Sequence, residues 1–137
     1  MEPAMANQNE LVMRILSELE EAGAENISST MNTVLDITGT HQDIESFQEA
    51  LATLIRDGFA NIGYAAGTLG KIEAISEEAA LATARALPEF LSFNNSQNLW
   101  IWDEERPLAE IVATTEGITR AREILDERGF QWWREVK

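Results

Sequence analysis

The sequence predicts a single domain of the α+β class, and three observations carry that prediction. A chain of 137 residues with 45% hydrophobic content is long enough to bury one core. Apolar residues recur at helical spacing in five separate stretches, which predicts amphipathic helices. Two further stretches, residues 59–65 and 99–113, are rich in β-branched and aromatic residues, which is typical of strands. We therefore expect three N-terminal helices, a small antiparallel sheet with a hairpin, and a C-terminal helix.

The first helix is predicted over about residues 9–22. Residues 1–8 have no apolar period, so we expect a flexible leader there, followed by one domain over residues 9–137. Gly23 stands where a left-handed residue would end the helix. The apolar stripe of this helix comprises Leu11, Val12, Ile15, Leu16 and Leu19.

A short second helix is expected to begin at a cap supplied by Ser28 or Ser29 and to close at Gly39. Its apolar residues are Met31, Val34, Leu35 and Ile37. Residues 38–40 then form a short connection with a central glycine, which is typical of a helix-turn-helix.

The third helix is the clearest element of the chain. Thr40 and Asp43 have the spacing of an N-terminal capping box, and Gly58 marks the C-terminal end. Its core-facing stripe comprises Ile44, Phe47, Leu51, Leu54 and Ile55. Residues 59–65 follow as a strand.

The C-terminal half is predicted to hold two helices and a hairpin. Ser76 caps a fourth helix that ends before Pro88, within a segment at about 66–98. Residues 99–102 and 108–113 are expected to pair as a hairpin around the charged tip 103–107. Thr114 or Thr115 then caps the last helix, which ends at Gly129.

Charge and composition exclude several classes of function. There are 24 acidic and 10 basic residues, and the resulting net charge of −14 disfavours binding to nucleic acid or anionic membranes. Residues 1–64 carry eleven acidic side chains and only two basic ones, Arg14 and Arg56. The absence of cysteine excludes disulfides and thiolate metal sites, and it fits a reducing compartment. Because neither a signal peptide nor a long apolar run is evident, we expect a cytoplasmic protein.

The order of the predicted elements resembles that of winged helix-turn-helix domains, in particular regulators of the MarR type. Residues 54–59 (Leu-Ile-Arg-Asp-Gly-Phe) are similar to the end of the recognition helix and the strand after it. Residues 109–118 (Ala-Glu-Ile-Val-Ala-Thr-Thr-Glu-Gly-Ile) are similar to the second wing strand and the start of the next helix. The resemblance implies a winged-helix-like fold that dimerises through its terminal helices. The chain departs from the family at about 66–98, which predicts either an atypical insertion or a different α+β topology.

The surface predicted for DNA contact departs from that family. The third helix carries Asp43, Glu45 and Glu49 where a DNA reader presents basic or amide side chains. A DNA-binding alternative would use the residues Gln42, Ser46, Gln48, Arg106, Arg120 and Arg122.

No residue group predicts catalysis, a metal site or a cofactor. Residues 65–72 resemble a phosphate-binding loop, but Ile72 replaces the hydroxyl residue that holds Mg²⁺, which favours a plain loop. His41 is the only histidine, and without further ligands it favours a solvated residue. The acidic run at residues 103–105 favours a solvated hairpin tip over a Ca²⁺ site.

Four tryptophans are the candidate partner-binding residues: Trp100, Trp102, Trp132 and Trp133. They either pack the core or form an aromatic patch that binds another protein. We therefore expect a non-enzymatic domain that acts through protein–protein contacts, as a homodimer or with another protein. A DNA-binding transcriptional regulator is the first alternative, and a small enzyme with an unrecognised site is the second.

Overall fold

The computed structural model describes residues 3–66, 71–129 and 132–133, and it confirms the α+β class. The helices are α1 (Pro3–Leu19), α2 (Ile27–Val34), α3 (His41–Arg56), α4 (Glu77–Arg85) and α5 (Thr115–Arg128), with a 3₁₀ turn η1 (Leu87–Glu89). The strands are β1 (Ala24–Asn26), β2 (Ala60–Ala66), β3 (Lys71–Ala74), β4 (Leu91–Asn94), β5 (Leu99–Trp102) and β6 (Ala109–Ala113).

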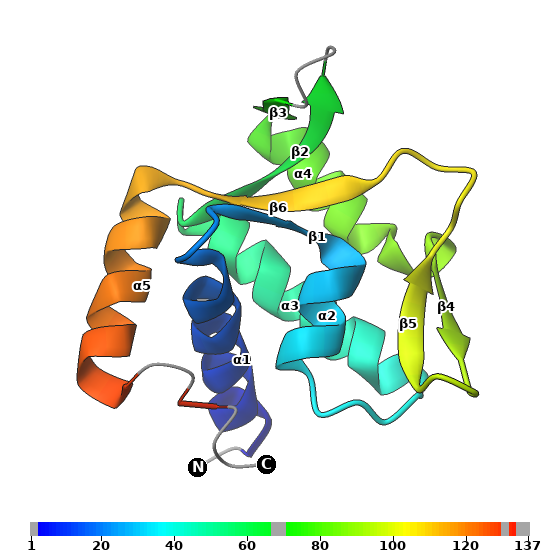
Figure 1. Cartoon of the computed structure of the whole chain (residues 1–137), viewed down its shortest axis with the longest axis horizontal. Helices are drawn as coiled ribbons and strands as arrows, with labels where there is room; N and C mark the ends of the chain where they lie inside the picture. The colour runs from blue at the N-terminus through cyan, green and yellow to red at the C-terminus, as the bar shows by residue number, and fades with distance from the viewer. Residues whose placement is uncertain (1–2, 67–70, 130–131, 134–137) are drawn as a thin grey trace.

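The strands form two antiparallel sheets. The larger has the order β1-β6-β2-β3, and β4 and β5 form a separate hairpin. In the larger sheet Ile111 of β6 lies opposite Glu25 of β1 and Ile62 of β2. Figure 1 shows this sheet crossing one end of α1, α2 and α3, with α5 and the β4–β5 hairpin on opposite flanks.

One core lies between the sheet and the helices. The stripe predicted on α3 is confirmed, because Ile44, Phe47, Leu51, Leu54 and Ile55 are all buried. Residues of every layer meet it: Ile15 and Leu16 from α1, Met31 from α2, Ile62 and Ile111 from the sheet, and Ile124 from α5. The helix α3 is therefore the element around which the others pack.

The predicted helix ends are confirmed at four places. Gly58 and Gly129 adopt positive φ angles of 79° and 93° after α3 and α5. Ser76 Oγ accepts a hydrogen bond from Ala79 N at the start of α4, and Thr114 Oγ1 accepts one from Gly117 N at the start of α5.

The predicted hairpin of residues 99–102 with 108–113 is wrong. β5 pairs with β4 (Leu-Ser-Phe-Asn), a strand that the sequence pattern did not predict, and β6 pairs with β1 and β2 instead. β6 instead lies between two strands, and its buried residue Ile111 has Glu25 of β1 on one side and Ile62 of β2 on the other. A hairpin partner next to it in the chain could pair with only one edge of β6.

Boundaries in the N-terminal half also differ from expectation. The helix α1 begins at Pro3 and ends at Leu19, and the strand β1 was not anticipated. The cap of α2 is Asn26, whose side chain accepts from Ser29 N, and the chain leaves the helix after Val34, well before Gly39. Thr40 makes no side-chain capping bond to α3, because its hydroxyl bonds to that of Thr38 instead. Asp43 accepts from Thr38 N and Gly39 N.

Candidate functional site

Two of the candidate tryptophans, Trp100 and Trp102, lie on the inner face of the β4–β5 hairpin. They are 6% and 8% exposed, while their neighbours Leu99 and Ile101 face outward. Trp100 packs edge-to-face against Phe93, with ring centroids 5.1 Å apart. These two residues therefore belong to the core and not to an exposed aromatic patch.

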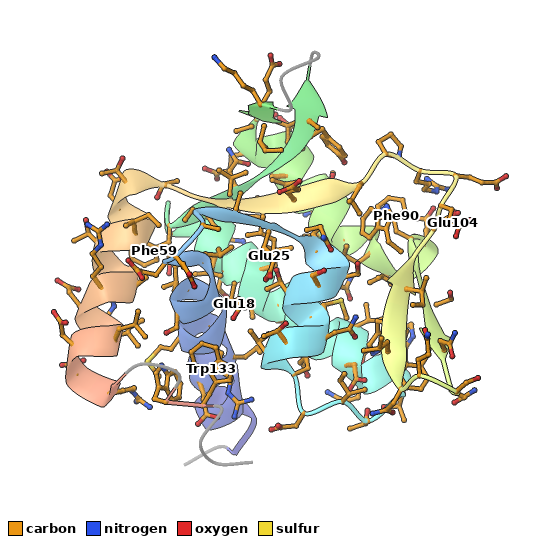
Figure 2. All side chains as sticks on the ribbon, in the orientation of Figure 1. Glu18, Glu25, Phe59, Phe90, Glu104 and Trp133 are labelled. Atoms are coloured by element: carbon orange, nitrogen blue, oxygen red, sulfur yellow. The ribbon has the colours of Figure 1, made fainter. Side chains whose placement is uncertain are left out.

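The other two tryptophans lie beside α1. Trp133 is 2% exposed, and Figure 2 shows it next to the lower half of this helix. Trp132 is partly buried, donates from Nε1 to Ser17 Oγ at 3.1 Å and carries the guanidinium of Arg128 over its ring. The fold thus places the two pairs of tryptophans in separate regions.

Asp43 is the most heavily hydrogen-bonded carboxylate of the described chain. It is 3% exposed and accepts bonds from Thr38 N, Thr38 Oγ1, Gly39 N and Trp100 Nε1 at 2.7–3.1 Å. Burial on its own would raise the pKa of Asp43, but the bonds from Thr38, Trp100 and Gly39 together lower that pKa below its ordinary value. Asp43 is therefore ionised at neutral pH and joins the connection before α3 to the hairpin.

Asn32 of α2 holds the hairpin from the other side. Its amide nitrogen donates to Trp100 O at 2.9 Å, and its amide oxygen accepts from Trp100 N at 2.8 Å. The Asn32 side chain thus makes with β5 the pair of hydrogen bonds that a neighbouring strand would make. Together with Asp43, it fixes the backbone and the ring of the same tryptophan.

The structure does not bring the candidate DNA-contacting residues together. Gln42 and Ser46 bond to each other on α3, whereas Gln48 donates to the carbonyl oxygens of Ala84 and Arg85 in α4. The arginines lie on the flanks, Arg106 in the β5–β6 connection and Arg120 and Arg122 in α5, and Figure 1 shows these elements at opposite sides.

Each of these arginines has an intramolecular partner. Arg106 lies 3.5 Å from an Asp103 oxygen and stacks over Phe90, which Figure 2 shows near the β5–β6 connection. Arg120 pairs with Glu123 at 3.2 Å, and Arg122 pairs with Glu20 at 3.3 Å. Their charge is therefore already compensated within the fold.

A groove of about 670 Å³ is formed by α1, the segment 34–38 and α3. Its lining includes one guanidinium and five carboxylates, those of Glu10, Asp36, Asp43, Glu45 and Glu49. Leu11 and Leu35, 7% and 8% exposed, supply apolar surface to the same lining. We name this feature the acidic groove.

Arg14 is the guanidinium of the acidic groove, and it is 8% exposed. It donates to Val34 O at 2.8 Å and to Glu10 Oε2 at 2.6 Å, and it lies 3.5 Å from Asp36 Oδ2. These contacts attach α1 to the chain that leaves α2. One wall of the groove is therefore held in place by an arginine and two carboxylates.

The remaining candidates show no assembled chemistry. His41 is exposed at the first position of α3, and the acidic tip residues Glu104 and Glu105 are exposed. The centre of the phosphate-loop match, 67–70, lies outside the described residues, and Lys71 begins a strand where such a loop requires a helix. No group of three potential metal ligands was found among the residues that the structure describes.

Comparison of the chain with models of protein families, with curated proteins and with solved structures found no significant match. Within the described ranges no helix combines the length and the apolar character needed to cross a membrane. The function must therefore be argued from the surface itself.

The sequence did not predict the acidic groove. It singled out the acidic residues of α3 but did not assign a role to Glu10, Arg14 or Asp36. The available signal was the charge asymmetry of residues 1–64, where eleven acidic side chains surround two arginines. The sequence alone does not show that α1 lies beside α3.

Proposed function

We propose that the chain is a cytoplasmic, non-enzymatic, winged-helix-like domain that binds another protein and does not bind DNA. The winged-helix part of the proposal is supported by the sheet. The strand β1, between α1 and α2, joins β6 and β2 in one antiparallel sheet that closes one end of the three N-terminal helices. The segment between β2 and β6 holds β3, α4 and the β4–β5 hairpin. The expected insertion at about 66–98 covers β3, α4 and β4, whereas β5 was expected to be a wing strand.

The outward face of α3 carries the functional part of the proposal. In a DNA-binding domain of this kind the corresponding helix enters the major groove. Here Glu45 and Glu49 are exposed on it, while Arg56 is the basic residue at its far end. Two carboxylates facing the phosphates would repel DNA, and the net charge of −14 adds to that repulsion.

The last helix favours a different protein over a second copy of the chain. The exposed residues of α5 are all polar or charged, among them Glu116, Thr119, Glu123 and Glu127. Stable homodimer interfaces have an apolar centre. We therefore expect a heterologous partner whose surface is basic.

Fluorescence anisotropy with labelled mixed-sequence duplex DNA tests this proposal. We expect no binding at protein concentrations up to about 50 µM, in about 50 mM and in about 200 mM salt. Micromolar binding that weakens steeply between the two salt concentrations would overturn the proposal in favour of a DNA-binding regulator. In that case substitution of Arg120 and Arg122 by Ala would identify the surface.

A further inference from the structure

We infer that β3 is an edge through which two copies of the chain associate. In this arrangement β3 pairs antiparallel with β3 of a second copy, and Ile72 lies on the twofold axis between them. The inference goes beyond the proposed function, because it concerns neither α3 nor α5. It is carried by the open edge of the larger sheet, by the direction of the Ile72 backbone groups and by the order of two charges.

The outer edge of β3 is accessible. β3 is the last strand of the larger sheet and pairs with β2 on one side. Lys71, Glu73 and Ala74 are exposed, and Ile72 is half-buried. Figure 1 shows β3 at the top of the molecule, away from α1, α5 and the β4–β5 hairpin. The described part of the chain therefore leaves this edge open to another strand.

The backbone of Ile72 faces the open edge. Ile75 N donates to Ile62 O of β2 at 2.9 Å. Because successive residues of an antiparallel strand bond to opposite sides, Glu73 and Lys71 also face β2, whereas Ile72 N–H and C=O point away from it. Across a twofold axis at Ile72, each Ile72 N–H would donate to the C=O of the other Ile72. The two four-stranded sheets would then join into one continuous sheet.

The charges on β3 fit this register. Lys71 and Glu73 flank Ile72 and project from the same face of the sheet. In an antiparallel pair centred on Ile72, Lys71 lies opposite Glu73 of the second copy, and the same contact recurs across the axis. These are the non-hydrogen-bonded positions, at which facing side chains are closest. Opposite charges at such positions stabilise a pair of strands.

The order of the charges also selects the occupant. Charged side chains at a sheet edge commonly prevent association between copies, because like charges meet there. On β3 an axis at Lys71 or at Glu73 would bring like charges together, whereas the axis at Ile72 sets each charge against its opposite. A second copy is therefore complementary to this edge as it stands. A strand of another protein would need the same two charges at the same spacing.

The contact is small, and it must overcome the repulsion between two chains that each carry a net charge of −14. We therefore expect a weak dimer, with a Kd on the order of 0.1–1 mM. The polar surface of α5 argues against a second copy at that helix, and β3 is a separate surface.

Sedimentation equilibrium of the full chain, from about 20 µM to about 1 mM in about 150 mM NaCl, tests the inference. Lys71→Glu and Glu73→Lys each set like charges opposite one another, and the double variant restores opposite charges. The matched controls are Arg85→Glu and Glu127→Lys, which change the net charge equally at exposed positions of α4 and α5. Circular dichroism checks that every variant retains the fold.

We expect each single reversal at β3 to weaken dimerisation about tenfold relative to its control. The double variant, and an equimolar mixture of the two single variants, should dimerise about as well as the wild type. Hydrogen exchange of the Ile72 amide should slow at high protein concentration, because this amide becomes bonded only in the dimer.

A wild type that stays monomeric up to about 1 mM would overturn the second copy as the occupant of this edge. Single reversals that behave like their controls would place the contact elsewhere, and a double variant as weak as the single ones would refute the register. None of these measurements involves DNA or a second protein, so their failure would leave the proposed function untouched.

Discussion

At the scale of single residues, Asp43 has more structural consequences than any residue that was selected for function. Its carboxylate takes hydrogen bonds from two residues before α3 and from a tryptophan that lies 57 positions later in the chain. Bonds to an ionised acceptor are stronger than bonds between neutral groups. The charge of Asp43 therefore contributes directly to the free energy of unfolding.

Asp43→Asn should destabilise the protein by about 2–3 kcal/mol at pH 7, because the bonds from Thr38, Gly39 and Trp100 lose their charged acceptor. The pKa of Asp43 is lowered in the folded state, so its contribution is complete above the pKa of the unfolded chain, about 3.9. That contribution is lost as the pH falls through the lower, folded pKa.

Urea titrations at a series of pH values between about 5 and 2.5 measure this contribution. The wild type should lose stability across that range more steeply than Asp43→Asn, whereas the exposed control Asp126→Asn should follow the wild type. Parallel curves for the wild type and Asp43→Asn would show that another group governs the acid response.

Gly117 marks a second residue whose identity is fixed by a close approach. A Cβ built at this position would lie 1.9 Å from Phe59 O, and that neighbour is backbone and cannot rotate away. We expect Gly117→Ala to destabilise the protein by about 3 kcal/mol or more. Gly23→Ala, where the left-handed backbone has φ +79° but open space, should cost about 1–2 kcal/mol. Thermal denaturation of the two variants separates steric overlap from backbone strain, and similar losses would contradict this account.

At the scale of elements, helices were easier to predict from the sequence than strand partners. The apolar stripe of α3 and the N-terminal caps of α4 and α5 are local, since every residue of the signal lies within a few turns. The partners of β6 come from residues 24–26 and 60–64, and no local pattern identifies them. The acidic groove could not be predicted for the same reason, because Glu10 and Asp36 come to face α3 only through the packing of α1.

The docking of the β4–β5 hairpin depends on one side chain, that of Asn32. The amide of Asn32 makes both of its hydrogen bonds with the backbone of Trp100. We expect Asn32→Ala to reduce stability by about 2 kcal/mol and to increase hydrogen exchange at the Trp100 amide. The exposed turn residue Asn95 offers the control, because Asn95→Ala should change neither quantity. Unaltered exchange at Trp100 in Asn32→Ala would mean that Phe93 and Asp43 hold the hairpin without help.

At the scale of the whole molecule, the net charge of −14 opposes the compact state, because folding brings like charges closer together. The exposed ion pairs Arg120–Glu123 and Arg122–Glu20 offset little of this repulsion.

Salt should therefore stabilise this protein. We expect the Tm to rise by several degrees between about 20 mM and about 300 mM NaCl, since the Debye length shortens several-fold over that range. Differential scanning calorimetry measures the effect, and the Asp126→Asn, Glu127→Gln variant should show a smaller rise. A Tm that falls with salt would mean that attractive ion pairs outweigh the repulsion.

The position of β6 at the centre of the larger sheet sets the order in which the chain can fold during its synthesis. β2 ends at Ala66 and β6 begins at Ala109, so at about 5–20 residues per second β2 waits about 2–9 s for its neighbour. Until then, the edges of β1 and β2 that pair with β6 lack their hydrogen-bonding partner. During synthesis, the nascent chain therefore requires either rapid collapse of its three N-terminal helices or binding by a chaperone.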